Sequence, residues 1–110
     1  MYTLEQFLYG RELHPELVSV LRNLSDIYGT NLLFLSRDAK WVNFCVRGYT
    51  DEVLFRDLQD HQDEIFGADF RDDPYFHVVR SYSGATRGIF LLYQSTTALY
   101  YEYLSGFWYY

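Results

Sequence analysis

The sequence predicts an α+β fold: N-terminal helices followed by two ββα units, with a four-stranded antiparallel sheet and the helices packed mainly on one face. Apolar residues recur at helical spacing in the first part of the chain and at every second position, as in a strand, further along. Glycines and polar turns then separate short apolar runs. The order strand, strand, helix occurs twice at a constant offset, which aligns Phe44 with Phe90 and Thr50 with Thr96. We expect residues 1–110 to form a single domain, because this length is ordinary for one.

Two helices are expected before the first strand. Thr3 and Gln6 fit a capping box, in which each side chain bonds the other residue's backbone amide, at the start of a helix over residues 4–9. Pro15 suits the first position of a second helix, which Gly29 would end. One face of that second helix is apolar and consists of Leu17, Leu21, Leu24 and Tyr28.

The first ββα unit follows these helices. Residues 32–35 form a short apolar run, residues 37–40 are polar and residues 41–46 alternate, which together predict a hairpin. Thr50 is a good N-cap for the next helix, and Gly67 would end that helix. The core faces of the second strand and of the helix are expected to carry Val42, Phe44, Val46, Leu54, Leu58, His61 and Ile65.

The second ββα unit is expected to repeat the first. Glycines between its two apolar runs are typical of a hairpin loop, and two threonines offer a helix N-cap. The predicted elements are a strand over residues 75–82, a loop over residues 83–88, a strand over residues 89–93 and a helix from Thr96 or Thr97 to Leu104.

Charge and composition exclude several classes of protein. The formal net charge is −6 and the pI about 4.8, and such an acidic surface repels nucleic-acid backbones and anionic membranes. The longest apolar run, residues 89–93, is far shorter than a membrane-spanning helix. A lone cysteine, Cys45, forms no internal disulfide, and the first residues lack the pattern of a signal peptide. We expect a cytoplasmic protein that binds neither a membrane nor, directly, nucleic acid.

No arrangement of residues predicts an active site. Cys45 and His77 both lie on expected strands, as a Cys–His dyad would require. However, Cys45 lies among apolar neighbours, where an inert buried thiol is typical. The glycines at residues 84–88 are followed by a strand and not by the helix that a phosphate-binding loop needs. We expect no catalytic residue and no cofactor.

Two pairs at helical spacing are candidates for holding a metal ion: Asp57 with His61, and Asp60 with Glu64. None of the known spacings of zinc or calcium ligands occurs in the sequence. His61 also falls on the apolar face of its helix, which is typical of a histidine at the edge of the core. We therefore expect no metal site.

The negative charge is concentrated in one helix and the loop after it. Residues 51–73 hold nine acidic and two basic side chains. Such a face favours a protein partner with a basic surface, and its carboxylates would stand where nucleic-acid phosphates bind. The alternative is a solvated helix that serves only solubility. The residues predicted to contact the partner are Asp57, Asp60, Asp63 and Glu64 on the outer faces of the helix, and Asp69, Asp72 and Asp73 in the loop.

The C-terminal part of the chain is unusually aromatic. Eight of the 18 residues from 93 to 110 are Tyr, Phe or Trp. A helix with three tyrosines on more than one face cannot bury all of them, and Tyr and Trp are enriched at interfaces. The alternative is that the last helix and the tail fold back and complete the core. The residues predicted to bind a partner or to form a homodimer are Tyr100, Tyr101, Tyr103, Phe107, Trp108, Tyr109 and Tyr110.

Together these features favour a small acidic inhibitor that occupies a basic or nucleic-acid-binding surface of a partner protein. In size and charge the chain is similar to phage antagonists of bacterial defence, such as anti-CRISPR proteins, and to immunity proteins that neutralise nuclease toxins. It shares no motif with them. One alternative is a dimeric acidic chaperone or adaptor that uses the aromatic C-terminus, since secretion chaperones have a similar size and charge. A third hypothesis is a small enzyme with scattered site residues.

Overall fold

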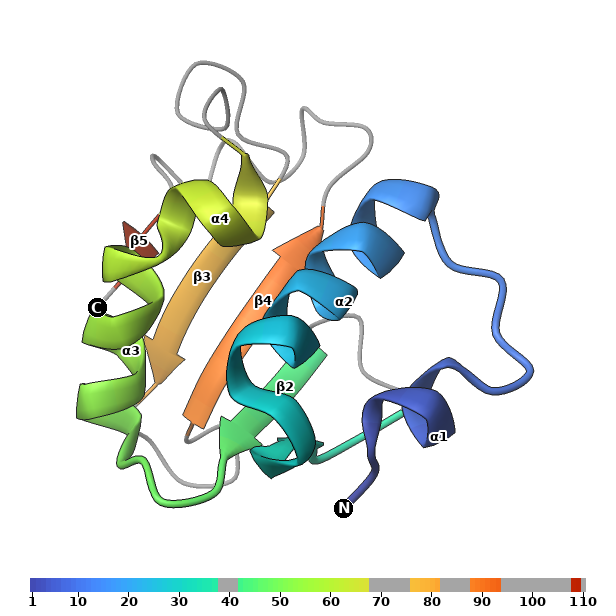
Figure 1. Cartoon of the computed structure of the whole chain (residues 1–110), viewed down its shortest axis with the longest axis horizontal. Helices are drawn as coiled ribbons and strands as arrows, with labels where there is room; N and C mark the ends of the chain where they lie inside the picture. The colour runs from blue at the N-terminus through green and yellow to red at the C-terminus, as the bar shows by residue number, and fades with distance from the viewer. Residues whose placement is uncertain (38–41, 68–75, 82–87, 94–107, 110) are drawn as a thin grey trace.

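The computed structural model shows a sheet with helices in front of it (Figure 1). Up to the fourth strand the order of helices and strands is the expected one, except that the third helix is divided in two and a short 3-10 turn precedes the first strand. The helix expected from Thr96 or Thr97 to Leu104 lies outside the described residues. Within the part of the chain that is described, no helix is both long enough and apolar enough to cross a membrane. The described residues are 1–37, 42–67, 76–81, 88–93 and 108–109.

The two N-terminal helices form where their capping residues predict. Helix α1 spans Leu4–Leu8, and both bonds of the capping box are present. The Thr3 N–H donates to Gln6 Oε1 at 2.9 Å, and the Gln6 N–H donates to Thr3 Oγ1 at 3.3 Å. Helix α2 spans Pro15–Tyr28, with its proline in the first turn. His14 adds a cap that we did not predict, because its Nδ1 accepts a backbone N–H of that turn at 3.2 Å.

Four strands pair antiparallel, which confirms the predicted sheet. The strand order is β1-β2-β4-β3-β5, and the pairs β1–β2, β2–β4 and β4–β3 are antiparallel. The fifth differs from our expectation of a tail, because β5 pairs parallel with β3. A short 3-10 turn, η1 (Gly29–Asn31), leads into the first strand. The strands are β1 (Leu32–Phe34), β2 (Val42–Val46), β3 (Phe76–Ser81), β4 (Gly88–Tyr93) and β5 (Trp108–Tyr109).

One face of the sheet packs against the helices, as expected. Phe44 and its cross-strand partner Ile89 belong to a buried cluster that also holds side chains of the helices. Helix α2, helix α3 (Asp51–Asp60) and helix α4 (Gln62–Phe66) lie on this side of the sheet (Figure 1). Their contributions to the cluster include Leu21, Leu24, Leu54, Leu58 and Ile65.

The helix after the first hairpin is interrupted, which corrects one expectation. We predicted a single helix ending at Gly67, but His61 separates α3 from α4 with φ −106° and ψ 15°. The His61 side chain is 34% exposed, so it lies at the edge of the core and not inside it. The break accompanies a contact with α2, in which Asn23 Nδ2 donates to the Ile65 carbonyl oxygen at 3.0 Å. This partner is far away in the sequence, so local pattern alone does not reveal it.

The alignment of the two hairpins by a constant offset is wrong at the level of residues. Phe44 pairs with Ile89, and Phe90 pairs with Asn43. Because side chains alternate along a strand, Phe44 and Phe90 point to opposite faces of the sheet. Phe44 is buried against the helices, whereas Phe90 is half-buried on the other face. The order of strands therefore repeats, but the side-chain pattern does not.

Candidate functional site

Three carboxylates of α3 and α4 are exposed and close together in the chain. Asp60 ends α3, and Asp63 and Glu64 lie in the first turn of α4. Among the described residues none of the three forms an ion pair, whereas Glu52 pairs with Arg56 at 2.7 Å. We call Asp60, Asp63 and Glu64 the acidic surface.

Asp57 differs from the other residues predicted on the outer faces of the helix. Its side chain is only 29% exposed, and its Oδ2 accepts the hydroxyl of Tyr28 from α2 at 2.7 Å. His61 Nδ1 lies 3.6 Å from the same Oδ2 and 2.9 Å from the Asp57 carbonyl oxygen. The fold therefore uses this carboxylate to join α2 to the junction of α3 and α4.

These contacts shift the pKa of two groups. The pKa of His61 lies above its ordinary value of 6.5, first because Nδ1 bonds to the Asp57 carbonyl oxygen, while partial burial acts in the opposite direction. The nearby carboxylates of Asp57, Glu64 and Asp60 raise it further. Burial, followed by the hydrogen bond to Asp57, raises the pKa of Tyr28 far above its usual range. The tyrosine hydroxyl is therefore protonated at neutral pH and acts as the donor.

The two residues considered for nucleophilic catalysis are not brought together. Cys45 lies on β2 and His77 on β3, and β4 separates these strands. Strand spacing alone separates β2 from β3 by about 9–10 Å. The register adds to this distance, because Phe44, next to Cys45, pairs with Ile89 of β4, whereas His77 pairs with Leu92. Burial also raises the pKa of the Cys45 thiol, which lowers its reactivity at neutral pH.

The pairs considered for metal binding do not form a site in the described part of the chain. No group of three or more His, Cys, Asp or Glu side chains among these residues is placed to hold a metal ion. Asp57 and His61 do approach each other, but the Tyr28 hydroxyl already occupies the carboxylate. Asp60 and Glu64 belong to different helices, on either side of the break.

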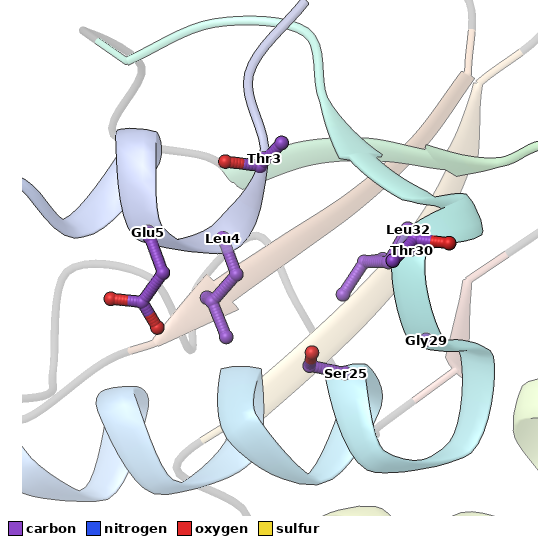
Figure 2. A pocket seen from close by; sticks show the side chains of 7 residues that line it. All are labelled: Thr3, Leu4, Glu5, Ser25, Gly29, Thr30 and Leu32. Atoms are coloured by element: carbon purple, nitrogen blue, oxygen red, sulfur yellow. The ribbon is translucent and has the colours of Figure 1, made fainter.

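An open cavity of about 260 Å³ lies between α1 and the end of α2 (Figure 2). Leu4 and Ser25 face each other across it (Figure 2). Two of its polar side chains have other roles, because Thr3 caps α1 and Glu5 pairs with Arg22 at 3.2 Å. We assign no chemistry to this cavity.

Most predicted contact residues of the loop and the tail lie outside the described residues. The exceptions are Trp108 and Tyr109, whose backbone forms β5 opposite Val78 and Val79 of β3. Part of the expected tail therefore extends the sheet. The predicted residues that are not described are Asp69, Asp72, Asp73, Tyr100, Tyr101, Tyr103, Phe107 and Tyr110.

Two features of this region were missed by sequence reasoning. The first is the hydrogen bond of Tyr28 to Asp57. The sequence placed Tyr28 on the apolar face of its helix, and a buried tyrosine hydroxyl normally has a partner, but that partner was not predicted.

The second is apolar surface on α3. Val53 is 50% exposed and shares a helical stripe with Asp57 and Asp60 at i, i+4 and i+7. Tyr49, also exposed, packs edge-on against Tyr28 with 5.7 Å between ring centroids. Apolar surface therefore adjoins the carboxylates of α3.

Comparison with known proteins does not assign a function to this region. The chain matches no protein-family model, and comparison with curated proteins and with solved structures found no match.

Proposed function

We propose that this protein is a small acidic inhibitor, without enzymatic activity, that binds a basic or nucleic-acid-binding surface of a partner protein in the cytoplasm. Phage anti-defence proteins and nuclease-immunity proteins, which it resembles in size and charge, are the classes concerned. The observation that supports the proposal most is the acidic surface. Its three carboxylates are exposed and have no cationic partner among the described residues.

Unpaired carboxylates favour a partner of opposite charge. Exposed carboxylates of like charge repel one another, and a basic partner would remove that repulsion. Complementary charge also raises the association rate and disfavours acidic competitors. Arginine binds carboxylates and phosphates through the same bidentate geometry. A groove that binds nucleic acid therefore has the chemistry required of the partner.

Asp57 is left out of the proposed contact set, because it is committed to Tyr28 and His61. Neutralising it would alter its contacts with Tyr28 and His61 as well as the charge. Val53 is included, since it is exposed on the same stripe of α3 as Asp60. Apolar side chains enclosed by polar ones are typical of the centre of an interface.

The test is the capture of partners from host-cell lysate by the tagged protein at low and at high salt, read by mass spectrometry. The variant that neutralises the acidic surface carries Asp60→Asn, Asp63→Asn and Glu64→Gln. A matched control changes the net charge equally on other exposed residues, through Glu12→Gln, Glu16→Gln and Asp26→Asn.

We expect the native protein and the control to capture the same basic protein at low salt only. The acidic-surface variant should bind it more weakly by roughly tenfold or more, because three charge contacts are lost. A partner captured equally by all three proteins at both salt concentrations would contradict the proposal. That result would favour the chaperone or adaptor hypothesis, in which the aromatic C-terminus makes the contact.

A further inference from the structure

His61 occupies the break between α3 and α4, where its backbone and its ring bond to the same atom. The His61 N–H donates to the Asp57 carbonyl oxygen at 3.1 Å, and Nδ1 lies 2.9 Å from that oxygen. A carbonyl oxygen only accepts hydrogen bonds, so Nδ1 carries a proton in this geometry. The ring can therefore be neutral or charged without losing the bond, and its charge depends on Nε2.

The carboxylate of Asp57 connects this ring to a third helix. Its Oδ2 lies 3.6 Å from His61 Nδ1 and accepts the Tyr28 hydroxyl of α2 at 2.7 Å. Three helices therefore meet at one carboxylate. Charging the ring strengthens the contact to Asp57 by direct attraction, and losing the charge leaves a neutral hydrogen bond.

The groups that surround His61 are acidic or neutral. Helix α3 contributes the charges of Asp57 and Asp60, and α4 contributes that of Glu64. From α2, Tyr28 donates to the same Asp57 carboxylate and is neutral. Among the described residues, no Lys or Arg forms an ion pair with these carboxylates. His61 is both the C-cap of α3 and the N-cap of α4, so the dipoles of the two helices act on its charge in opposite directions.

We propose that Tyr28, Asp57 and His61 form a pH-sensitive clamp, which holds α2, α3 and α4 together most firmly when His61 is protonated. The clamp also regulates the acidic surface, a consequence that rests on the proposed function. Deprotonation of His61 removes one unit of positive charge that acts on Asp60 and Glu64. A basic partner then binds more tightly above this transition than below it, and its binding in turn lowers the pKa of His61.

The first experiment uses the free protein and follows the His61 Cε1–H resonance by NMR as the pH changes. The ring should titrate above 6.5 in the native protein and at a lower pH in Asp57→Asn, whose amide oxygen still accepts the Tyr28 hydroxyl. Glu64→Gln should lower the pKa by less. An unchanged His61 titration in Asp57→Asn would overturn the clamp.

The second experiment measures the free energy of unfolding in urea against pH. His61 has its pKa raised by folding, so its contribution is fully present below about 6.5 and is lost as the pH rises through the folded-state value. His61→Gln keeps a side-chain N–H donor but does not titrate, so the decrease should be smaller in this variant. Identical pH profiles for His61→Gln and the native protein would contradict the proposal.

The third experiment measures binding of an oligoarginine peptide at about pH 6 and about pH 8, where arginine itself does not titrate. The native protein should bind about two- to fivefold more tightly at the higher pH, and His61→Gln should show no such gain. Equal gains in both proteins would overturn the regulation by His61. Failure of the peptide to bind at either pH would count against the proposed function, while the NMR titration still decides on the clamp.

Discussion

The hydroxyl of Tyr28 links two segments that are far apart in the chain. It donates to Asp57 Oδ2 at 2.7 Å from the last turn of α2. Tyr28 is buried, and a buried hydroxyl without a partner is costly. At the scale of single residues, this bond explains why one carboxylate of an acidic helix turns inward and its neighbours do not.

Tyr28→Phe should lower the free energy of unfolding by about 1 kcal/mol, measured by urea denaturation. The ring stays in place and only the hydrogen bond is lost, while Asp57 remains partly open to water. Tyr9→Phe is the matched control, because Tyr9 is 79% exposed. Equal stability of both variants would show that the bond to Asp57 contributes nothing.

Helix α3 is short and carries its charges unevenly. Asp51 and Glu52 lie in its first turn, where negative charge interacts favourably with the helix dipole. Asp57 and Asp60 lie toward its other end, where the interaction is unfavourable. At the scale of the element, such a helix depends on its N-cap, and Thr50 Oγ1 accepts the Val53 N–H at 3.2 Å.

Thr50→Ala should destabilise the protein by about 1 kcal/mol, because one N–H of the first turn loses its acceptor. Thermal unfolding followed by circular dichroism measures the effect. Thr30→Ala changes the same residue type in the exposed turn before β1 and should cost less than half as much. A result in the reverse order would mean that the cap is not important for α3.

At the scale of the whole molecule, the first residues of the chain cover the edge of the sheet at β1. Tyr2 and Phe34 exchange two backbone hydrogen bonds of 2.7 Å, which cover the outer edge of β1. At the other end of the strand order, β5 adds a short parallel edge to β3. Short edge strands of this kind reduce unwanted pairing with other chains.

Substitutions of Phe44 and Phe90 test which face of the sheet each side chain occupies. The alignment of the two ββα units had treated these residues as equivalent. Phe44→Ala should cost about 3–5 kcal/mol, because Phe44 is fully buried against the helices. Phe90→Ala should cost less than half of that, since Phe90 is half-buried on the other face. If Phe44→Ala does not fold, Phe44→Leu allows the same comparison by calorimetry with Phe90→Leu. Equal costs would contradict the pairing of Phe44 with Ile89.

The sequence by itself determined the elements that depend on nearby residues. The capping box of Thr3 and Gln6 and the N-cap at Thr50 involve bonds within one helical turn, and Pro15 begins α2 because its fixed φ suits the first helical position. The alternation in β2 likewise requires only one buried face, and Val42, Phe44 and Val46 are buried as predicted. From these local signals the antiparallel sheet, the helices on one face and the position of the exposed carboxylates could be predicted.

Only the tertiary structure decided the features that depend on distant partners. The break at His61, the inward turn of Asp57 and the parallel pairing of β5 each involve a contact with another element. The face of Phe90 depends on how β4 pairs with β2, and a shift of one residue would reverse it. Such contacts leave no periodic signal in the chain, because their energy comes from groups that the sequence separates by tens of residues.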